Sequence, residues 1–177
     1  MRNWLVIALG FFVGLNEVNA QFLRTIKKFP DTGQTGSFTA TFGEDHDYVI
    51  FAPLFSVWNS IVVVDSITGL MWQRGDGGEM TIENARIYAD TCTLMGFSDW
   101  RLPNILESYT ILNHQQVNPS LDVSVFNNTG AEYWWTVDRQ FNDSTKIWCT
   151  NAGGGAGNHR KTETISAGGT KRFHPRL

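Results

Sequence analysis

The side chains with the most reactive chemistry in this 177-residue chain are two cysteines and four histidines. Cys92 and Cys149 stand far apart and form no C-x-x-C redox motif, and the histidines show no metal-ligand spacing. In an exported protein such a pair suggests one disulfide, which stabilises a fold by roughly 2–4 kcal/mol. These residues therefore predict neither a catalytic centre nor a metal site.

The most distinctive segment is Gly96-Phe97-Ser98-Asp99-Trp100-Arg101-Leu102-Pro103. We expect the carboxylate of Asp99 and the guanidinium of Arg101 to be partly buried and to lock this loop through bidentate hydrogen bonds. Asp99 could instead serve as an acid or base, but no second carboxylate or histidine stands at a telling spacing. The structural interpretation is favoured.

An acidic group near the start of the chain offers hard oxygen ligands for a calcium ion. We favour the alternative of a solvated acidic loop, and expect no cofactor; a melting shift on adding calcium would separate the two. The carboxylates concerned are Asp31, Glu44, Asp45 and Asp47.

The C-terminal end of the chain is basic, although the net charge of the whole chain is −3. This asymmetry is typical of an anion-binding patch, and equally of a solvated edge strand guarded by cations. The net charge is too slight to indicate nucleic-acid binding. Beyond His159 the cations, opposed by Glu163 alone, are Arg160, Lys161, Lys171, Arg172 and Arg176.

Residues 1–20 have the pattern of a signal peptide. Arg2 precedes the apolar run Trp4 to Leu15, and Val18-Asn19-Ala20 suits a signal peptidase. The run falls short of the ~20 residues needed to cross a bilayer, and no later stretch is long and apolar enough. We expect a secreted or periplasmic protein that is cleaved after Ala20 and has no membrane span.

Two hairpins are predicted to carry the distinctive residues. The β-branched run Ile61–Val64 is followed by a short turn and by Leu70–Gln73, and Tyr133–Val137 should pair with Lys146–Thr150. A short strand is expected over Tyr48–Phe51. Two further segments are predicted to be a flexible or tightly turning glycine-rich loop, 152–157, and a last edge strand, 171–177.

Two helices are predicted between the hairpins. Thr81 is a good N-cap for the first, and Ala85, Tyr88, Ala89 and Cys92 follow the spacing of one helix face. Pro103 is well placed to open the second helix, whose apolar face would come from later residues. These are Ile105, Leu106, Tyr109 and Leu112.

Several motifs stand in an order that resembles a known family. They include Asp65 through Thr68-Gly69-Leu70-Met71-Trp72-Gln73, Asp99-Trp100-Arg101-Leu102-Pro103 and Tyr133-Trp134-Trp135-Thr136. They resemble the Lcl C-terminal domain, a bacterial exported domain formerly of unknown function and named after a collagen-like adhesin. Residues 1–20 would then be a signal peptide, 21–47 an irregular lead-in packed on the domain, and 48–177 the domain itself.

The resemblance implies an α+β fold related to C-type lectins and to formylglycine-generating enzymes, with short twisted antiparallel sheets, two helices and long loops. It implies adhesion to sulfated glycosaminoglycans, for which the five basic residues of the tail are the candidates. The other distinctive residues look structural. They are Trp72, Asp99, Trp100, Arg101, Pro103, Trp134, Cys92 and Cys149.

Three functions remain open at this point. The first is a non-catalytic exported module that binds an anionic, sulfated glycan or a cell-surface partner. The second is a structural or assembly component of the envelope that contacts another protein through exposed aromatic edges. An enzyme related to the formylglycine-generating oxidases is less favoured, because that chemistry needs a closely spaced reactive cysteine pair. The oligomeric state is not predicted.

Overall fold

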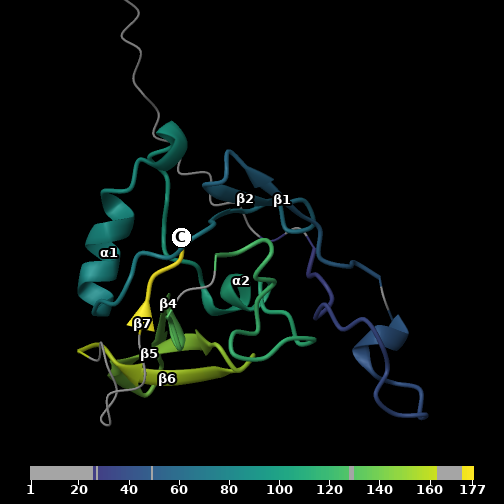
Figure 1. The fold of residues 1–177 in the computed structure, drawn as a ribbon. Coiled ribbons are helices and arrows are strands. Elements are labelled where there is room, and N and C mark those ends of the chain that lie inside the picture. Colours follow the sequence, from purple (N-terminus) through teal and green to yellow (C-terminus); the bar gives the residue numbers. More distant parts are fainter. Residues whose placement is uncertain (1–25, 27, 49, 128–129, 163–172) are drawn as a thin grey trace, which may run out of the picture.

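The computed structural model describes residues 26, 28–48, 50–127, 130–162 and 173–177 (Figure 1). The expected signal peptide, Lys171 and Arg172 lie outside the described residues. The fold is α+β, as predicted, with one three-stranded sheet, one four-stranded sheet and two α-helices in the described ranges. None of the helices in these ranges is long and apolar enough to cross a membrane.

The first sheet contains strands β1 (Phe55–Trp58), β2 (Val62–Asp65) and β3 (Met71–Gln73), which are antiparallel in that order. The predicted hairpin of β2 and β3 is confirmed, with Val63 opposite Trp72. Its turn is fixed by Asp65, which accepts hydrogen bonds from the amide of Ile67 and the hydroxyl of Thr68. The carboxylate oxygens thus serve as hydrogen-bond acceptors for these two groups in place of water.

The second sheet has the order β6-β5-β4-β7. Strands β4 (Tyr133–Gln140) and β5 (Asp143–Asn151) form the predicted second hairpin, and β6 (Ala156–Arg160) follows the glycine-rich loop. Strand β7 (Phe173–His174) is the predicted edge strand, but it lies parallel to β4. The expectation of purely antiparallel sheets is therefore wrong at this pair.

Helix α1 (Ile82–Asp90) begins after Thr81, whose side chain accepts a hydrogen bond from the amide of Asn84, so the predicted N-cap is confirmed. Helix α2 (Ile105–Tyr109) begins after Asn104, so the prediction that Pro103 opens it is wrong. Asn104 and Glu107 form a capping box, in which the side chain of each residue accepts a hydrogen bond from the backbone amide of the other.

Two predictions about smaller segments are also wrong. The expected apolar face of α2 fails at Leu106, which is 60% exposed, while Glu107 is buried. Residues Asp45–Tyr48 form a 3-10 helix, η1, where we expected a strand to begin at Tyr48. A second 3-10 helix, η2 (Leu94–Gly96), follows α1.

The second sheet has a hydrophobic cluster on each face, because neighbouring side chains of a strand alternate between faces. Trp135 packs with Ile147, Phe173 and the buried face of α1. Trp134 points the other way, into a cluster that includes Trp72 of the first sheet. On this second face α2 contacts β5, where the hydroxyls of Ser108 and Thr150 are 2.7 Å apart.

Both cysteines lie in described segments, and no disulfide joins them. The predicted disulfide is therefore not formed in this structure. Cys149 is a buried member of the α1 cluster and its thiol donates to the carbonyl of Ile147 (3.7 Å), while Cys92 packs against the same cluster. Cys92 accepts a long hydrogen bond from the amide of Gln73. Both residues contribute apolar volume to the core.

The described part of the lead-in extends to the side of the molecule opposite α1 (Figure 1). It contacts the rest of the chain where the amide of His114 donates to the carbonyl of Thr32 and the side chain of Gln115 accepts from Thr35. Several of its large apolar side chains are exposed to solvent. The exposed residues are Phe29, Phe38 and Phe42 of the lead-in and, just after it, Tyr48 and Ile50.

Candidate binding site

Arg176, predicted to bind an anionic ligand, lies in the core with 1% of its surface exposed. Its guanidinium donates to the carbonyls of Gln73 (2.9 Å) and Arg74 (2.6 Å) and lies 3.9 Å from the carboxylate of Asp76. It also stacks over the ring of Phe126. The prediction that Arg176 is a surface ligand is wrong, since every one of these contacts is internal.

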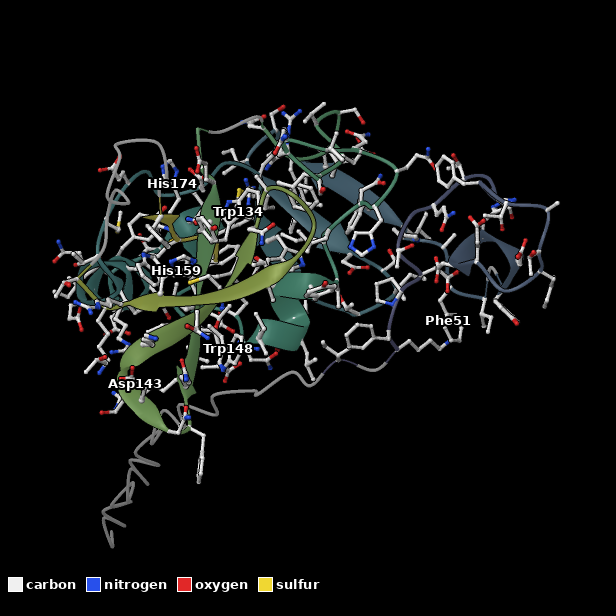
Figure 2. The ribbon with its side chains drawn as sticks, turned by 90° about the horizontal axis from the view of Figure 1, so that it is seen from below. Phe51, Trp134, Asp143, Trp148, His159 and His174 are labelled. Atoms are coloured by element: carbon white, nitrogen blue, oxygen red, sulfur yellow. The ribbon has the colours of Figure 1, made fainter. Side chains whose placement is uncertain are left out.

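Asp76 is the acidic centre of this buried group. Its carboxylate lies 2.8 Å from Nδ1 of His174 and accepts a hydrogen bond from the indole of Trp134. Figure 2 shows the side chains of His174 and Trp134 near each other on the sheet. Burial lowers the pKa of Arg176 to about 10, although Asp76 opposes this shift. We call these residues (Asp76, His174, Arg176) the buried lock.

The backbone explains why the last residues are buried. The carbonyls of Phe173, Pro175 and Leu177 accept hydrogen bonds from residues that lead out of β3 towards α1. At Gly77 a Cβ would lie 2.8 Å from Pro175, so only glycine lets the two segments approach this closely. The tail is thus inserted between β4 and the segment after β3.

Arg160 and Lys161, the other two described cations of the tail, lie at the edge strand β6 and just after it. Arg160 is exposed and stands directly opposite Lys146 of β5. Two residues further along, Asn158 stands opposite Trp148. These four residues share one face because directly opposed residues of an antiparallel pair point the same way. We call Lys146, Trp148, Asn158 and Arg160 the β5–β6 basic face.

We did not predict that Lys146 and Trp148 lie beside Arg160, because we expected no strand paired with β5 directly after the glycine-rich loop. The alternation within β5 was readable, however: Ile147 and Cys149 are buried on the α1 side, which leaves Lys146 and Trp148 on the other. In Figure 2, Asp143 marks the turn end of the hairpin and Trp148 lies further along β5. Asp143 is also a salt-bridge partner of Lys146, at 3.7 Å.

A cavity of about 190 Å³ lies where the distinctive motifs of the sequence meet, and we call it the motif pocket. Residues from the end of the first hairpin form one side and residues of the loop before α2 form the other. The chain's last residue also lines it. The lining residues are Leu70, Met71, Trp72, Phe97, Asp99, Trp100, Arg101, Pro103, Glu107 and Leu177.

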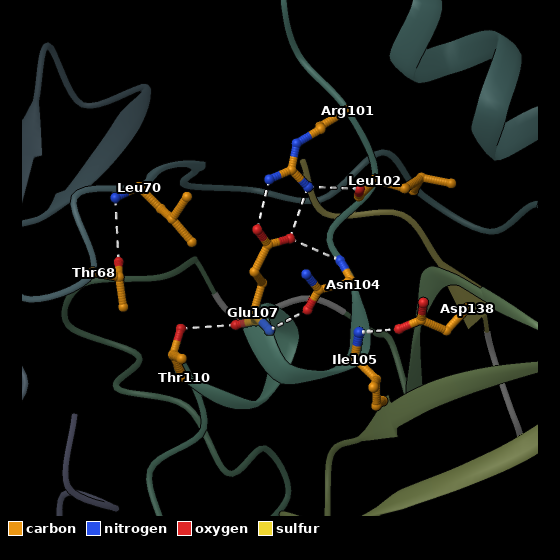
Figure 3. A network of polar contacts seen from close by, with 9 residues as sticks. All are labelled: Thr68, Leu70, Arg101, Leu102, Asn104, Ile105, Glu107, Thr110 and Asp138. Carbon is orange, nitrogen blue, oxygen red and sulfur yellow. Dashed lines mark hydrogen bonds and ion pairs between the residues drawn. The ribbon is translucent and has the colours of Figure 1, made fainter. Parts of the chain in front are cut away.

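Arg101 is held at the pocket by Glu107, and not by Asp99 as predicted (Figure 3). Its two terminal nitrogens lie 2.7 and 2.6 Å from the two carboxylate oxygens, and one of them also donates to the carbonyl of Leu102. Glu107 in addition accepts from the amide of Asn104. Asp99 is exposed, because the loop turns its side chain outward while α2 brings Glu107 beneath the arginine.

The carboxylate of Glu107 raises the pKa of Arg101, first through the hydrogen bonds and then through its charge, against the effect of burial. The guanidinium is therefore a fixed cation with a fixed partner. Of the two tryptophans beside it, Trp100 donates its indole N–H to the carbonyl of Leu94. Trp72 is 2% exposed, and its buried indole N–H has no hydrogen-bond partner within the described residues.

The four carboxylates considered for calcium are each engaged in the lead-in. Asp45 accepts from Thr32, and Glu44 accepts from the amides of Phe38 and Thr39. Asp47 accepts from the amide of Gly43, and Asp31 accepts from the amide of Phe51, 20 positions further along the chain. Within the described ranges no three acidic, histidine or cysteine side chains converge in a way that could hold a metal ion. The calcium hypothesis stays a prediction.

The protein is thus an α+β domain with two small sheets. It has a pocket lined by the distinctive sequence motifs and a C-terminal tail inserted into its core. The sequence profile of the Lcl C-terminal domain matches residues 61–168, and the chain belongs to that family. The comparisons with curated proteins and with solved structures gave no match. The expected kinship with C-type lectins and formylglycine-generating enzymes therefore stays a prediction.

Proposed function

We propose that this protein is an exported, non-catalytic module that binds a sulfated or otherwise anionic glycan through the β5–β6 basic face. The observation that carries the proposal is the register of β5 and β6, in which Lys146 stands directly opposite Arg160 with Trp148 as the next residue on the same face. Two cations beside an aromatic ring provide charge for sulfate groups and a flat apolar surface for a sugar ring.

The energetics of the strand pair support this assignment. Like charges directly opposite each other across an antiparallel pair destabilise it. Lys146 also forms a salt bridge to Asp143, in which both side chains are about one third exposed (35% and 34%) and the nitrogen–oxygen distance is 3.7 Å. An anion lying between Lys146 and Arg160 would meet both positive charges, and a guanidinium can bind an oxyanion with two parallel hydrogen bonds.

The test is the affinity of the purified mature protein for heparin, compared with a neutral polysaccharide, at low and at physiological salt. We expect heparin to bind selectively and the binding to weaken with salt, because exposed charges are screened. Lys146→Gln and Arg160→Gln should each weaken it. Equal binding of heparin and the neutral polymer, or none at either salt, would contradict the proposal.

A matched control comes from the same sheet. Arg139 of β4 is exposed, but it pairs with Ile147, whose side chain points into the α1 cluster on the opposite face. Arg139→Gln removes the same charge and should leave heparin binding nearly unchanged. N-terminal sequencing of protein secreted by the host would test the expected cleavage after Ala20.

A specific observation also favours the second candidate, recognition of another envelope protein. Phe38 and Phe42 of the lead-in are 73% and 70% exposed, and hydrogen bonds to Glu44 and Asp47 hold the loop that carries them. Ile50, just after the lead-in, is 70% exposed, and its amide donates to Asp31. A pre-organised exposed apolar group of this kind is typical of a protein contact. Pull-down from envelope extracts with wild-type protein and with Phe38→Ser/Phe42→Ser would test it: the candidate fails if both capture the same proteins.

A further inference from the structure

We propose that the motif pocket is a second binding site, separate from the basic face, for a small uncharged ring compound that carries a carbonyl or ether oxygen. The site lies between the first hairpin and the loop before α2, on residues that the proposed glycan site does not use. The proposal does not depend on the glycan proposal, and each can fail alone.

The size and walls of the pocket set the size and polarity of the ligand. A buried apolar cavity of about 150 Å³ takes up a benzene molecule in another protein. The motif pocket, at about 190 Å³, therefore has room for one ring with a short substituent. Leu70, Met71 and Leu177 provide aliphatic walls, and Phe97, which is 41% exposed, provides an aromatic edge at the opening.

The indole N–H of Trp72 is the reason for expecting a hydrogen-bond acceptor on the ligand. A buried donor without a partner costs about 1–3 kcal/mol, so native structures rarely retain one without a reason. Trp72 lines the pocket and its N–H has no partner among the described residues. The other indole of the pocket, on Trp100, is already satisfied by a carbonyl. The N–H is enclosed in this structure, so a ligand oxygen would reach it through a shift of the side chains around it, and would then gain a hydrogen bond without breaking an existing one.

The charges of the pocket argue for a neutral ligand. Arg101 is the cation here, and both oxygens of Glu107 already bind its guanidinium. The exposed carboxylate of Asp99 then leaves an excess of negative charge at the rim. A sulfate or carboxylate would be repelled, which distinguishes this pocket from the basic face.

The experiment is a titration of ¹⁵N-labelled protein with acetophenone and with ethylbenzene, which have nearly the same shape and differ in the carbonyl oxygen. We expect both to shift amide signals of Met71, Phe97 and Arg101, and only acetophenone to move the indole N–H signal of Trp72 downfield. Acetophenone should bind about three- to tenfold more tightly, which is the net value of one hydrogen bond.

Two variants complete the test. Trp72→Phe assigns the indole signal and should abolish the preference for acetophenone, so that the two probes bind about equally. If this variant fails to fold, the two wild-type titrations still decide. Arg139→Gln, the neutral control of the sheet, should bind both probes as the wild type does. The proposal is overturned if neither probe shifts the pocket signals, or if both bind equally while the Trp72 indole signal stays in place.

Discussion

Arg160 and Arg176 belong to the same basic stretch of sequence, but they lie in opposite environments. Arg160 is exposed at an edge strand, whereas Arg176 is enclosed by two carbonyls, Asp76 and the ring of Phe126. The difference comes from topology, because β6 ends a hairpin at the edge of the sheet while the tail returns beside β4. Charge along a sequence therefore does not reveal which cations face a ligand.

The buried lock and the basic face also differ in what each charge contributes. Removing one partner of a buried ion pair is costly because the other charge stays buried and uncompensated. Removing an exposed charge changes stability little, but it changes the attraction of a charged ligand. The comparison thus separates residues that hold the fold from residues that bind.

The largest effect is expected from Arg176→Met. It leaves Asp76 without its arginine partner and removes a guanidinium donor from the carbonyls of Gln73 and Arg74. We expect the free energy of unfolding to fall by about 3–5 kcal/mol, measured by urea denaturation. Arg160→Met serves as the matched control and should stay within about 0.5 kcal/mol of wild type. Similar losses for both variants would remove the distinction between the two arginines.

A smaller effect is expected from Glu107→Ala. This change removes the capping box of α2 and the partner of Arg101, and should cost about 1–2 kcal/mol. Asp99→Ala, at the residue that the sequence suggested as the partner of Arg101, should cost less than about 0.5 kcal/mol. Thermal unfolding of the two variants side by side measures the difference. The reverse order would show that Arg101 pairs with Asp99 in solution.

The smallest effect concerns the exposed carboxylates of the lead-in. Hydrogen bonds, first from the amide of Phe38, lower the pKa of Glu44 below its ordinary value of 4.5. A carboxyl whose folded pKa is lowered adds stability above that ordinary value and loses it as the pH falls through the folded pKa. Hydrogen-exchange protection of the Phe38 and Thr39 amides should therefore decrease in acid. In Glu44→Gln this pH dependence should disappear; an unchanged profile would contradict the role of Glu44.

Local patterns in the sequence predicted local structure well. The two hairpins and the N-cap at Thr81 depend on residues close together in the chain, and they are confirmed. The partner of Arg101 could also have been predicted, since Asn104 and Glu107 have capping-box spacing. We predicted instead the carboxylate of Asp99, which is nearer in the sequence. That choice failed because distance along the chain does not determine which carboxylate lies beneath a guanidinium.

The long-range features were beyond such reasoning. The two-residue strand β7 has almost no pattern of its own, and its parallel pairing with β4 depends on contacts about 40 positions away in the sequence. The burial of Arg176 and the motif pocket both follow from that pairing, since Leu177 lines the pocket. The basic face depends in turn on the register of β5 and β6 across a loop of glycines.

If the β5–β6 basic face, and not the basic tail as a whole, binds the ligand, the two cations of that face should account for most of the affinity. The most direct measurement is the heparin affinity of Lys146→Gln/Arg160→Gln beside Arg139→Gln, each at two salt concentrations, by isothermal titration calorimetry. We expect at least about tenfold weaker binding and a shallower salt dependence for the double variant alone. Equal affinities for the two proteins would contradict it.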